Sequence, residues 1–305
     1  MKKMTTKQEA YREEYREYLM ELFSKAWNTR PIDFIYTLLR VSGVQYGHWD
    51  PFSEILDAFE DYNKFLDFSD TLEGKAPFRV GLLMYCQAIE ITAIHELFAN
   101  LIRCCSGQDF VIKPFIESQK QKKREPLYYI PPSANTKVKI LKELALKSND
   151  LKFQEIFDSF YNDQIRNSFV HSDYCITSDE YRWTEGGPPS SVSLEYINEL
   201  ITRTFAFFEV LLQAWKSWLI WFNNHPKYIR LPQYEVFELL TNETDGLYGF
   251  AMHFSNGQRA YFERYSEVVD SRNLTLNKDG SINFFVGDLS KLEMEWKVDG
   301  KVFIG

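Results

Sequence analysis

The spacing of hydrophobic residues predicts that the first three quarters of the chain is helical. Apolar side chains recur there every three or four positions, which is the period of one face of an α-helix. Seven segments have this pattern. They are residues 7–27, 31–43, 50–68, 76–107, 133–150, 150–171 and 190–224.

Residues that favour helix ends support several of these boundaries. Proline is common in the first turn of a helix and glycine just after the last turn. We therefore expect Pro31 to open a helix that Gly43 closes, and Gly107 to end another. Ser, Asn and Asp side chains cap helix N-termini. The candidate caps of the next two helices are Ser133 or Asn135, and then Asn149 or Asp150.

Two other parts of the chain alternate between apolar and polar residues, as β-strands do. Residues 173–187, "DYCITSDEYRWTEGG", alternate around a turn and predict a β-hairpin or extended excursion between two helices. After Leu231, short segments rich in aromatic and β-branched residues are separated by turn sequences such as "SNGQ" and "NKDG". They predict a small antiparallel β-domain of six or seven strands. The expected fold class is therefore α+β, mostly helical with a small C-terminal β-domain.

This pattern divides the chain into three expected parts. Residues 1–76 form an N-terminal helical extension, and residues 77–230 form a helical domain that carries the hairpin-like insertion near residues 173–189. Residues 231–305 form the β-domain. The sequence "NNHPKYIRLP" breaks the last long helix, so we place the boundary of the β-domain there.

Composition narrows the class of protein. The chain has 305 residues, a formal net charge of -8 and 45% hydrophobic residues, which is ordinary for a globular protein. Its start lacks the apolar core of a secretory signal. The most apolar stretch, Phe205–Phe222, contains Glu209 and Lys216, so we interpret it as a buried helix and not as a membrane span. The 4 cysteines form no CxxC pair, which is neither a zinc pattern nor a disulfide framework. We expect a cytoplasmic protein with reduced thiols, no metal and no cofactor.

Lysine and arginine gather in one region of this acidic chain. The net charge argues against broad, non-specific coating of nucleic acid, but a local basic patch suffices to bind phosphates. The alternative is a solvated loop followed by a solvated helix face. The candidate RNA-binding residues are Lys120, Lys122, Lys123, Arg124, Lys137 and Lys139.

The stretch "YNDQIRNSFVHSDY", residues 161–174, carries the candidate chemistry. On a helix, residues four apart stack on one face. Asp163, Asn167 and His171 therefore form a row. Arg166 lies next to this row on the helix surface, and its side chain is long enough to reach it. Polar residues thus form a short row at the C-terminal end of an otherwise apolar helix.

These residue types suit the cleavage of RNA without a metal ion. A histidine titrates near neutral pH and serves as general base or acid. Arginine keeps its charge and stabilises the transition state of a reaction in which the 2′-hydroxyl attacks the adjacent phosphate. In these roles, His171 transfers protons, Arg166 stabilises the phosphate and Asn167 positions it. A two-fold dimer would bring two such sets together and supply both a base and an acid.

Glu90 and Asp163 are candidate supporting residues. Glu90 lies within the apolar sequence "CQAIEITAI", which predicts that it is buried and needs a partner. Arg166 or His171 would serve, and so would an unrelated lysine or arginine.

The sequence "IRNSFVHSDY" resembles the signature of the HEPN superfamily (higher eukaryotes and prokaryotes nucleotide-binding). That signature is an arginine, a polar residue directly after it, and a histidine a few positions later. Arg166, Asn167 and His171 fill these places. The resemblance covers residues 77–223, about half of the chain. The hairpin-like insertion and the C-terminal β-domain are not part of the family core.

The resemblance implies a helical bundle and a function. Many HEPN proteins are metal-independent endoribonucleases that act as homodimers in toxin–antitoxin, abortive-infection and other anti-phage defence systems. Some carry an acidic residue on the helix that faces the motif, which Glu90 would match. The expected partners are an RNA substrate, a second copy of the chain, and an antitoxin or other protein. The alternative is a catalytically inactive HEPN-like module that binds a protein partner or a nucleotide.

Overall fold

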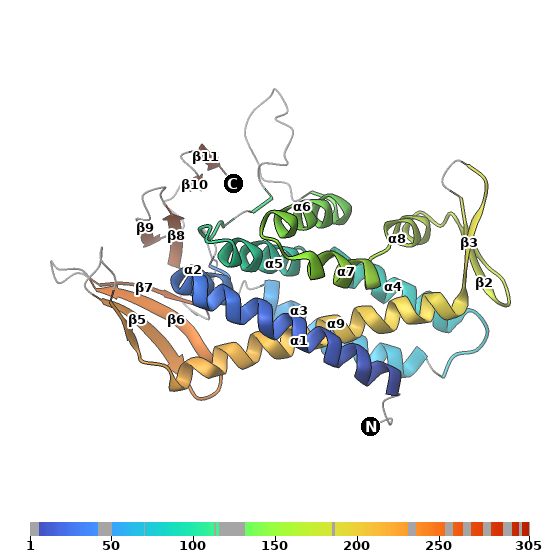
Figure 1. The fold of residues 1–305 in the computed structure, drawn as a ribbon, viewed down its shortest axis with the longest axis horizontal. Helices are drawn as coiled ribbons and strands as arrows, with labels where there is room; N and C mark the ends of the chain where they lie inside the picture. The colour runs from blue at the N-terminus through green and yellow to red at the C-terminus, as the bar shows by residue number, and fades with distance from the viewer. Residues whose placement is uncertain are drawn as a thin grey trace. The chain divides into compact units, whose positions relative to one another are not determined.

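The computed structural model confirms the α+β class (Figure 1). It describes residues 6–41, 51–69, 71–112, 114–115, 132–184, 187–230, 236–253, 259–264, 270–276, 282–288, 295–298 and 301–304. The helices are α1 (Thr6–Thr29), α2 (Pro31–Leu39), α3 (Pro51–Ser69), α4 (Ala76–Glu90), α5 (Thr92–Cys105), α6 (Ala134–Lys147), α7 (Leu151–Phe160), α8 (Asp163–Val170), α9 (Leu194–Trp221) and the short 3-10 helix η2 (Phe222–Asn224).

The strands follow α8 in the sequence. They are β1 (Tyr174–Ile176), β2 (Glu180–Trp183), β3 (Ser190–Ser193), β4 (Tyr228–Ile229), β5 (Val236–Asn242), β6 (Gly246–His253), β7 (Arg259–Glu263), β8 (Asp270–Leu276), β9 (Ile282–Asp288), β10 (Glu295–Val298) and β11 (Lys301–Ile304). The strands β5 to β11 correspond to the seven short segments after Leu231, and their pairings are antiparallel. The prediction of six or seven strands is confirmed.

The prediction of one helix over residues 150–171 is wrong, because the segment forms two helices. Tyr161 is extended (φ -99°, ψ 118°) between α7 and α8. The side chain of Asn162 then caps α8 by accepting a hydrogen bond from the Ile165 N–H at 3.1 Å. The Tyr85 hydroxyl accepts from the Asn162 N–H at 2.9 Å and donates to its C=O at 3.2 Å. Asn favours such local caps over the middle of a helix, so the sequence supports a break here.

The run of residues 76–107 is likewise two helices, since Ile91 is extended (φ -60°, ψ 100°) between α4 and α5. Pro31 opens α2 as predicted, and Gly107 with φ 72° follows α5 as expected. The helix that Pro31 opens ends earlier than predicted, at Leu39, because Arg40 takes a left-handed conformation (φ 50°). Gly43 lies outside the described residues.

The structure resolves the choice between alternative caps. The Ser133 hydroxyl accepts from the Thr136 N–H and caps α6, while Asp150 accepts from the Phe153 N–H at 3.1 Å and caps α7. Each cap satisfies a backbone N–H group that has no partner inside its helix.

The hairpin predicted within residues 173–187 is confirmed as β1 and β2, which pair antiparallel. A third strand, β3, pairs with β2 and was predicted as the start of the last helix. α9 instead begins at Leu194, where the Ser193 hydroxyl accepts from the Tyr196 N–H at 3.1 Å. The residues before Ser193 are serine and valine, which fit an extended strand as well as a helix end.

The chain forms two compact units that alternate along the sequence. Unit 1 comprises residues 1–21, 52–92 and 133–212, and unit 2 comprises residues 22–51, 93–132 and 213–305. The predicted domain boundaries at residues 76 and 230 stay a prediction.

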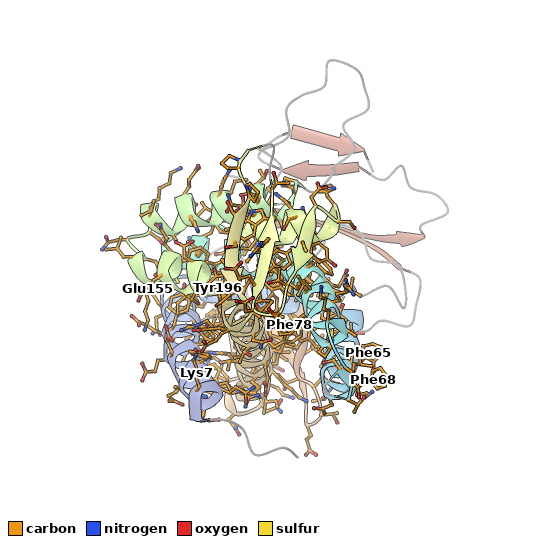
Figure 2. All side chains as sticks on the ribbon, turned by 90° about the vertical axis from the view of Figure 1, so that its right-hand side faces the viewer. Lys7, Phe65, Phe68, Phe78, Glu155 and Tyr196 are labelled. Carbon is orange, nitrogen blue, oxygen red and sulfur yellow. The ribbon has the colours of Figure 1, made fainter. Side chains whose placement is uncertain are left out.

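The core of unit 1 is aromatic. Phe207 of α9 stacks on Phe160 of α7 at 4.4 Å between ring centroids and meets Tyr15 of α1 edge-on at 5.4 Å. These three side chains are at most 2% exposed. The stripe of apolar residues predicted for the first helix therefore faces a core. By contrast, Phe65 and Phe68 of α3, both labelled in Figure 2, are 54% and 59% exposed.

Unit 2 packs the four-stranded sheet β4–β5–β6–β7 against helix α2. Tyr36 of α2 lies 5.2 Å from Phe250 of β6, and Phe250 stacks on Phe237 of β5 at 4.9 Å. Gly246 opens β6 with φ 71°, and a Cβ there would lie 2.2 Å from the Leu219 carbonyl oxygen. Only glycine combines this conformation with so close an approach of two backbones.

Among the described residues, no single helix is both long and apolar enough to cross a membrane. The interrupted pair α4 and α5 passes that test only when the two helices are taken together. Of these helices, α5 buries 10 of its 14 residues and α4 buries 7 of its 15.

Candidate active site

Arg166 of α8 is held by two partners in unit 1. Its Nη1 donates a hydrogen bond to Asn167 Oδ1 at 2.7 Å, and its Nη2 forms an ion pair with Glu90 Oε1 at the end of α4. The Arg166 side chain is 23% exposed and that of Glu90 is 32% exposed. The prediction that Glu90 has a basic partner is confirmed, and of the alternatives the partner is Arg166. The prediction that Glu90 is buried holds only in part, because its side chain is half-buried.

The ion pair engages only part of the guanidinium group. Glu90 Oε1 contacts Nη2 without the alignment of a hydrogen bond, and the neighbouring Arg166 Nε is buried with no acceptor among the described residues. A guanidinium offers five N–H donors in a planar fork. Arg166 therefore keeps unused donor capacity beside a carboxylate.

His171 directly follows α8 and is exposed. Its backbone N–H donates to the Asn167 C=O at 2.9 Å, so His171 lies one turn after Asn167. The structure thus places the three motif residues within six positions on one short helix and its cap, with the imidazole accessible to solvent.

The inserted β-sheet packs against the other side of this short helix. The Tyr181 hydroxyl of β2 and the Ser168 hydroxyl are 2.9 Å apart and both residues are buried. Phe169 lies 5.2 Å from Tyr174, which in turn stacks on Tyr181 at 5.2 Å. α8 has only 8 residues, too few to be stable alone, so these contacts fix the orientation of the motif.

Two further side chains, Cys86 and Tyr161, interact electrostatically with the Glu90–Arg166 pair, and the sequence reasoning missed both. Burial raises the pKa of the Cys86 thiol to about 12, against the opposing charge of Arg166. Burial, then the charges of Asp163 and Glu90, raises the pKa of Tyr161. The Tyr161 hydroxyl oxygen is buried and has no hydrogen-bond partner among the described residues. Cys86 precedes Glu90 by four positions on α4, which is a signal the sequence does contain.

The other predicted residues lie in different surroundings. Asp163 Oδ2 accepts a hydrogen bond from Asn135 Nδ2 at 2.8 Å and so links α8 to α6. Lys137 is 2% exposed and its Nζ donates to Thr92 Oγ1 at 2.8 Å, whereas Lys139 is exposed. Of these two lysines, Lys139 is therefore the one that faces solvent.

The remaining predicted RNA-binding residues lie outside the part of the chain that the structure describes. They are Lys120, Lys122, Lys123 and Arg124.

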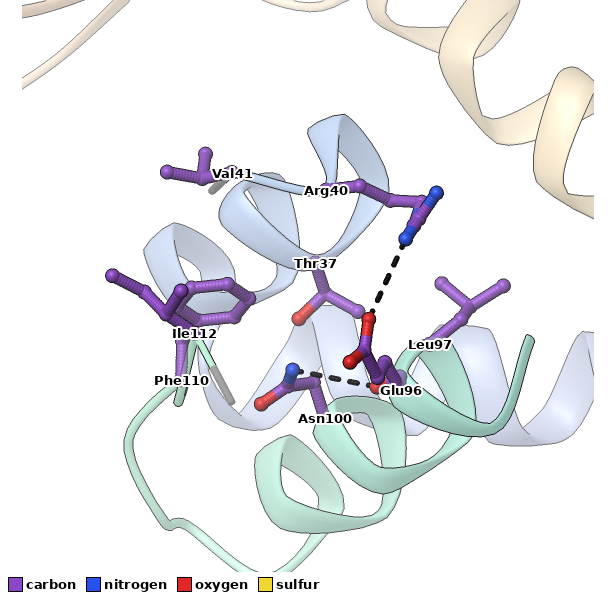
Figure 3. A pocket seen from close by; sticks show the side chains of 8 residues that line it. All are labelled: Thr37, Arg40, Val41, Glu96, Leu97, Asn100, Phe110 and Ile112. Carbon is purple, nitrogen blue, oxygen red and sulfur yellow. Dashed lines mark hydrogen bonds and ion pairs between the residues drawn. The ribbon is translucent and has the colours of Figure 1, made fainter. Parts of the chain in front are cut away.

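A small pocket of about 50 Å³ lies in unit 2 (Figure 3). Asn100 spans one side of it, donating to the Val111 C=O at 3.0 Å and accepting from the Val111 N–H at 2.9 Å. Glu96 pairs with Arg40 across the opening at 3.6 Å. Since the Asn100 amide and the Arg40–Glu96 pair are engaged within the protein, the pocket offers few groups to a ligand.

Metal ligands do not gather in the described part of the chain, where no group of three or more His, Cys, Asp or Glu side chains could hold an ion. The comparisons with known proteins add no relative: no protein-family model, no curated protein and no solved structure matches this chain. The candidate site therefore has to be judged on its geometry and on the resemblance of its motif.

Proposed function

We propose that this protein is a metal-independent endoribonuclease of the HEPN type that acts as a homodimer, in a toxin or anti-phage setting. One observation carries the proposal. An arginine that pairs with a carboxylate and an amide lies on a short helix, and an exposed histidine directly follows the last residue of that helix. This arrangement provides a fixed positive charge for a phosphate and a titratable group for proton transfer.

In the proposed reaction, His171 removes the proton of a ribose 2′-hydroxyl. The 2′-oxygen then attacks the adjacent phosphorus, and the bond from phosphorus to the 5′-oxygen of the next nucleotide breaks. Arg166 stabilises the negative charge on the phosphate, and Asn167 fixes the orientation of the guanidinium group. The products are a 2′,3′-cyclic phosphate and a 5′-hydroxyl.

The leaving 5′-oxygen needs a proton. A single His171, which holds the proton from the 2′-hydroxyl on the other side of the phosphate, is poorly placed to donate it to the 5′-oxygen. In a two-fold dimer, the partner subunit's His171 would act as this acid, because an isologous interface brings identical surfaces together. The dimer thus completes the reaction without a metal ion.

The test is cleavage of a mixed RNA pool in EDTA by the wild type, His171→Ala and Arg166→Ala. We expect the wild type alone to cut and to leave 2′,3′-cyclic phosphate ends. His225→Ala, which changes a histidine of unit 2, is the matched control and should cut like the wild type. Equal cutting by all four proteins would place the activity elsewhere. No cutting by any of them would favour the alternative of an inactive module, and a search for a protein partner or bound nucleotide would follow.

The dimer is tested separately. Sedimentation should give twice the chain mass of 36.1 kDa at the concentrations at which RNA is cut. Because each cleavage uses the His171 side chains of both chains, a mixed dimer of wild type and His171→Ala holds only one of them, so we expect an excess of His171→Ala to inhibit cleavage by the wild type. A monomer that cuts RNA at full rate would overturn the two-histidine mechanism.

A further inference from the structure

Glu90 covers the edge of Arg166 that is best suited to a phosphate. Arginine binds phosphate most strongly through two parallel N–H groups, and Nε with Nη2 forms one such edge. Here Glu90 Oε1 contacts Nη2 alone, while Nε beside it is buried without an acceptor among the described residues. A phosphate on this edge would form two hydrogen bonds in place of one imperfectly aligned ion pair.

Tyr161 holds a second unused donor in the same cluster. Its hydroxyl is buried and has no acceptor among the described residues, yet it lies near enough to Glu90 for the carboxylate to affect its pKa. A phenol with the ordinary tyrosine pKa of 10.0 is neutral at physiological pH, and burial raises the pKa of Tyr161 further. It can therefore donate a proton to a hydrogen bond but carries no charge that would repel Glu90.

Buried donors without partners are rare in folded proteins and each costs about 1–3 kcal/mol. Two of them belong to residues that interact with Glu90: Arg166 forms an ion pair with it, and the charge of Glu90 raises the pKa of Tyr161. The cluster thus contains Arg166, whose Nε has no acceptor among the described residues, and Glu90, which contacts only Nη2 of that arginine. It also contains the Tyr161 hydroxyl, which could donate to the Glu90 carboxylate. A rearrangement that satisfies all three groups requires one additional acceptor, which a phosphate supplies.

We propose that Glu90 is a place-holder: the scissile phosphate of RNA displaces it from the Nε–Nη2 edge of Arg166, and the Tyr161 hydroxyl then donates to the displaced carboxylate. This inference rests on the proposed function for the identity of the ligand. It makes Tyr161 a positioning residue, which acts through Glu90 and does not touch the reacting atoms. The Arg166 side chain as a whole is 23% exposed but its Nε is buried, so in this proposal the phosphate reaches the Nε–Nη2 edge only as Glu90 withdraws from it.

The experiment measures binding of a short, mixed-sequence 2′-O-methyl RNA, which lacks the nucleophilic hydroxyl and cannot be cut. Fluorescence anisotropy gives its dissociation constant for the full-length protein and its variants. Glu90→Gln removes the competing charge, so we expect binding about 5-fold tighter than for the wild type. Tyr161→Phe removes the donor for the displaced carboxylate, so we expect binding about 5-fold weaker. Glu96→Gln changes the glutamate of the arginine pair in unit 2 and should leave binding unchanged.

The double variant separates this exchange from a structural role of Tyr161. Once glutamine replaces Glu90, there is no displaced charge to stabilise, so adding Tyr161→Phe to Glu90→Gln should change binding by less than about 2-fold. An equal loss in both backgrounds would overturn the exchange, because it would mean that Tyr161 acts independently of Glu90.

The Nε–H signal of Arg166 in a ¹⁵N NMR spectrum gives a second measurement, and its loss in Arg166→Lys assigns it. We expect this signal to shift when the 2′-O-methyl RNA is added. A wild type that cuts RNA and binds the oligonucleotide while this signal stays unmoved would overturn the place-holder but leave the nuclease standing. A wild type that neither cuts nor binds would overturn both.

Discussion

Two buried polar clusters in this chain are built in opposite ways. In unit 2, Asp33 accepts from the Phe110 N–H at 2.8 Å and from Arg30 Nε at 2.7 Å, and its C=O accepts from the Thr37 hydroxyl at 2.7 Å. In unit 1, the hydroxyl of Tyr161 and the Nε of Arg166 have no partner among the described residues. Both clusters contain an arginine that pairs with a carboxylate, and Arg30 pairs with Asp109 as well as with Asp33.

We interpret this difference as one of role: the Asp33 cluster stabilises the fold, and the Arg166 cluster binds a ligand. The Asp33 cluster uses its carboxylate fully and joins α2 to the segment after α5, even though burial raises the pKa of Asp33. The Arg166 cluster leaves two donors unused among the described residues, on the same segment of chain as the exposed His171. Unsatisfied buried groups in folded proteins are few, and a catalytic or binding role is one of their recognised causes.

Removing the arginine from each cluster should have opposite consequences. The largest effect is expected for Arg166→Ala, which removes the charge that stabilises the phosphate. RNA cleavage should fall at least about 100-fold, while the stability of the fold should change by about 1 kcal/mol or less, since the Glu90 side chain is 32% exposed. Single-turnover cleavage and urea unfolding measure the two quantities. A loss of stability large enough to account for the loss of activity would place Arg166 with the structural residues.

Arg30→Ala is the matched change in unit 2. It leaves Asp33, which is 7% exposed, without its cationic partner, so unfolding should become easier by about 2 kcal/mol. The rate of cleavage per folded molecule should stay at the wild-type value. A large drop in that rate, at a temperature where the variant is fully folded, would contradict the division of roles between the two clusters.

The sequence predicted the motif but not the way it is held. Periodicity placed Arg166, Asn167 and His171 on a helical segment, and the apolar setting of Glu90 predicted a basic partner. The break at Asn162 was missed because the apolar period continues across it, although the residue type favours a cap. Tertiary contacts decided the outcome, since the Tyr85 hydroxyl replaces the helical hydrogen bonds of Asn162.

Other features could not be predicted from the sequence because they depend on tertiary contacts. The state of the Tyr161 hydroxyl depends on what packs around it from α4 and α8, and no local pattern encodes that. The strand β3 was predicted as helix because its four residues, "SSVS", carry little periodicity, and its pairing with β2 decides its conformation. Lys137 shows the same limit, because a lysine on an amphipathic helix is usually exposed but this one is buried against Thr92.

Two tyrosines of unit 1 allow the same comparison between a satisfied and an unsatisfied polar group, with a smaller expected effect on stability. Tyr181→Phe should lower the free energy of unfolding by about 1 kcal/mol, because its hydroxyl shares a buried hydrogen bond with Ser168. Tyr161→Phe should leave that free energy unchanged or raise it slightly, because the lost hydroxyl has no partner among the described residues. Chemical denaturation of both variants measures the difference. Equal destabilisation by the two changes would show that Tyr161 has a partner in solution.

The smallest effect concerns a satisfied charge network between α1 and α9, within unit 1. Hydrogen bonds from Tyr11 and Arg203 lower the pKa of Glu199 to about 2, with a further contribution from Lys7. A carboxyl group with a lowered pKa stabilises the fold above its ordinary value of 4.5, and this contribution is lost as pH falls towards about 2. The Glu199 side chain is 31% exposed, so solvent screening limits the contribution to about 1 kcal/mol.

We therefore expect wild type and Glu199→Gln to differ in unfolding free energy at about pH 7 and to converge near about pH 2. A difference that persists unchanged at the acidic end would assign it to packing and not to charge. Cleavage by Glu199→Gln should match the wild type at neutral pH, because this network, like the Asp33 cluster, has its partners within the fold.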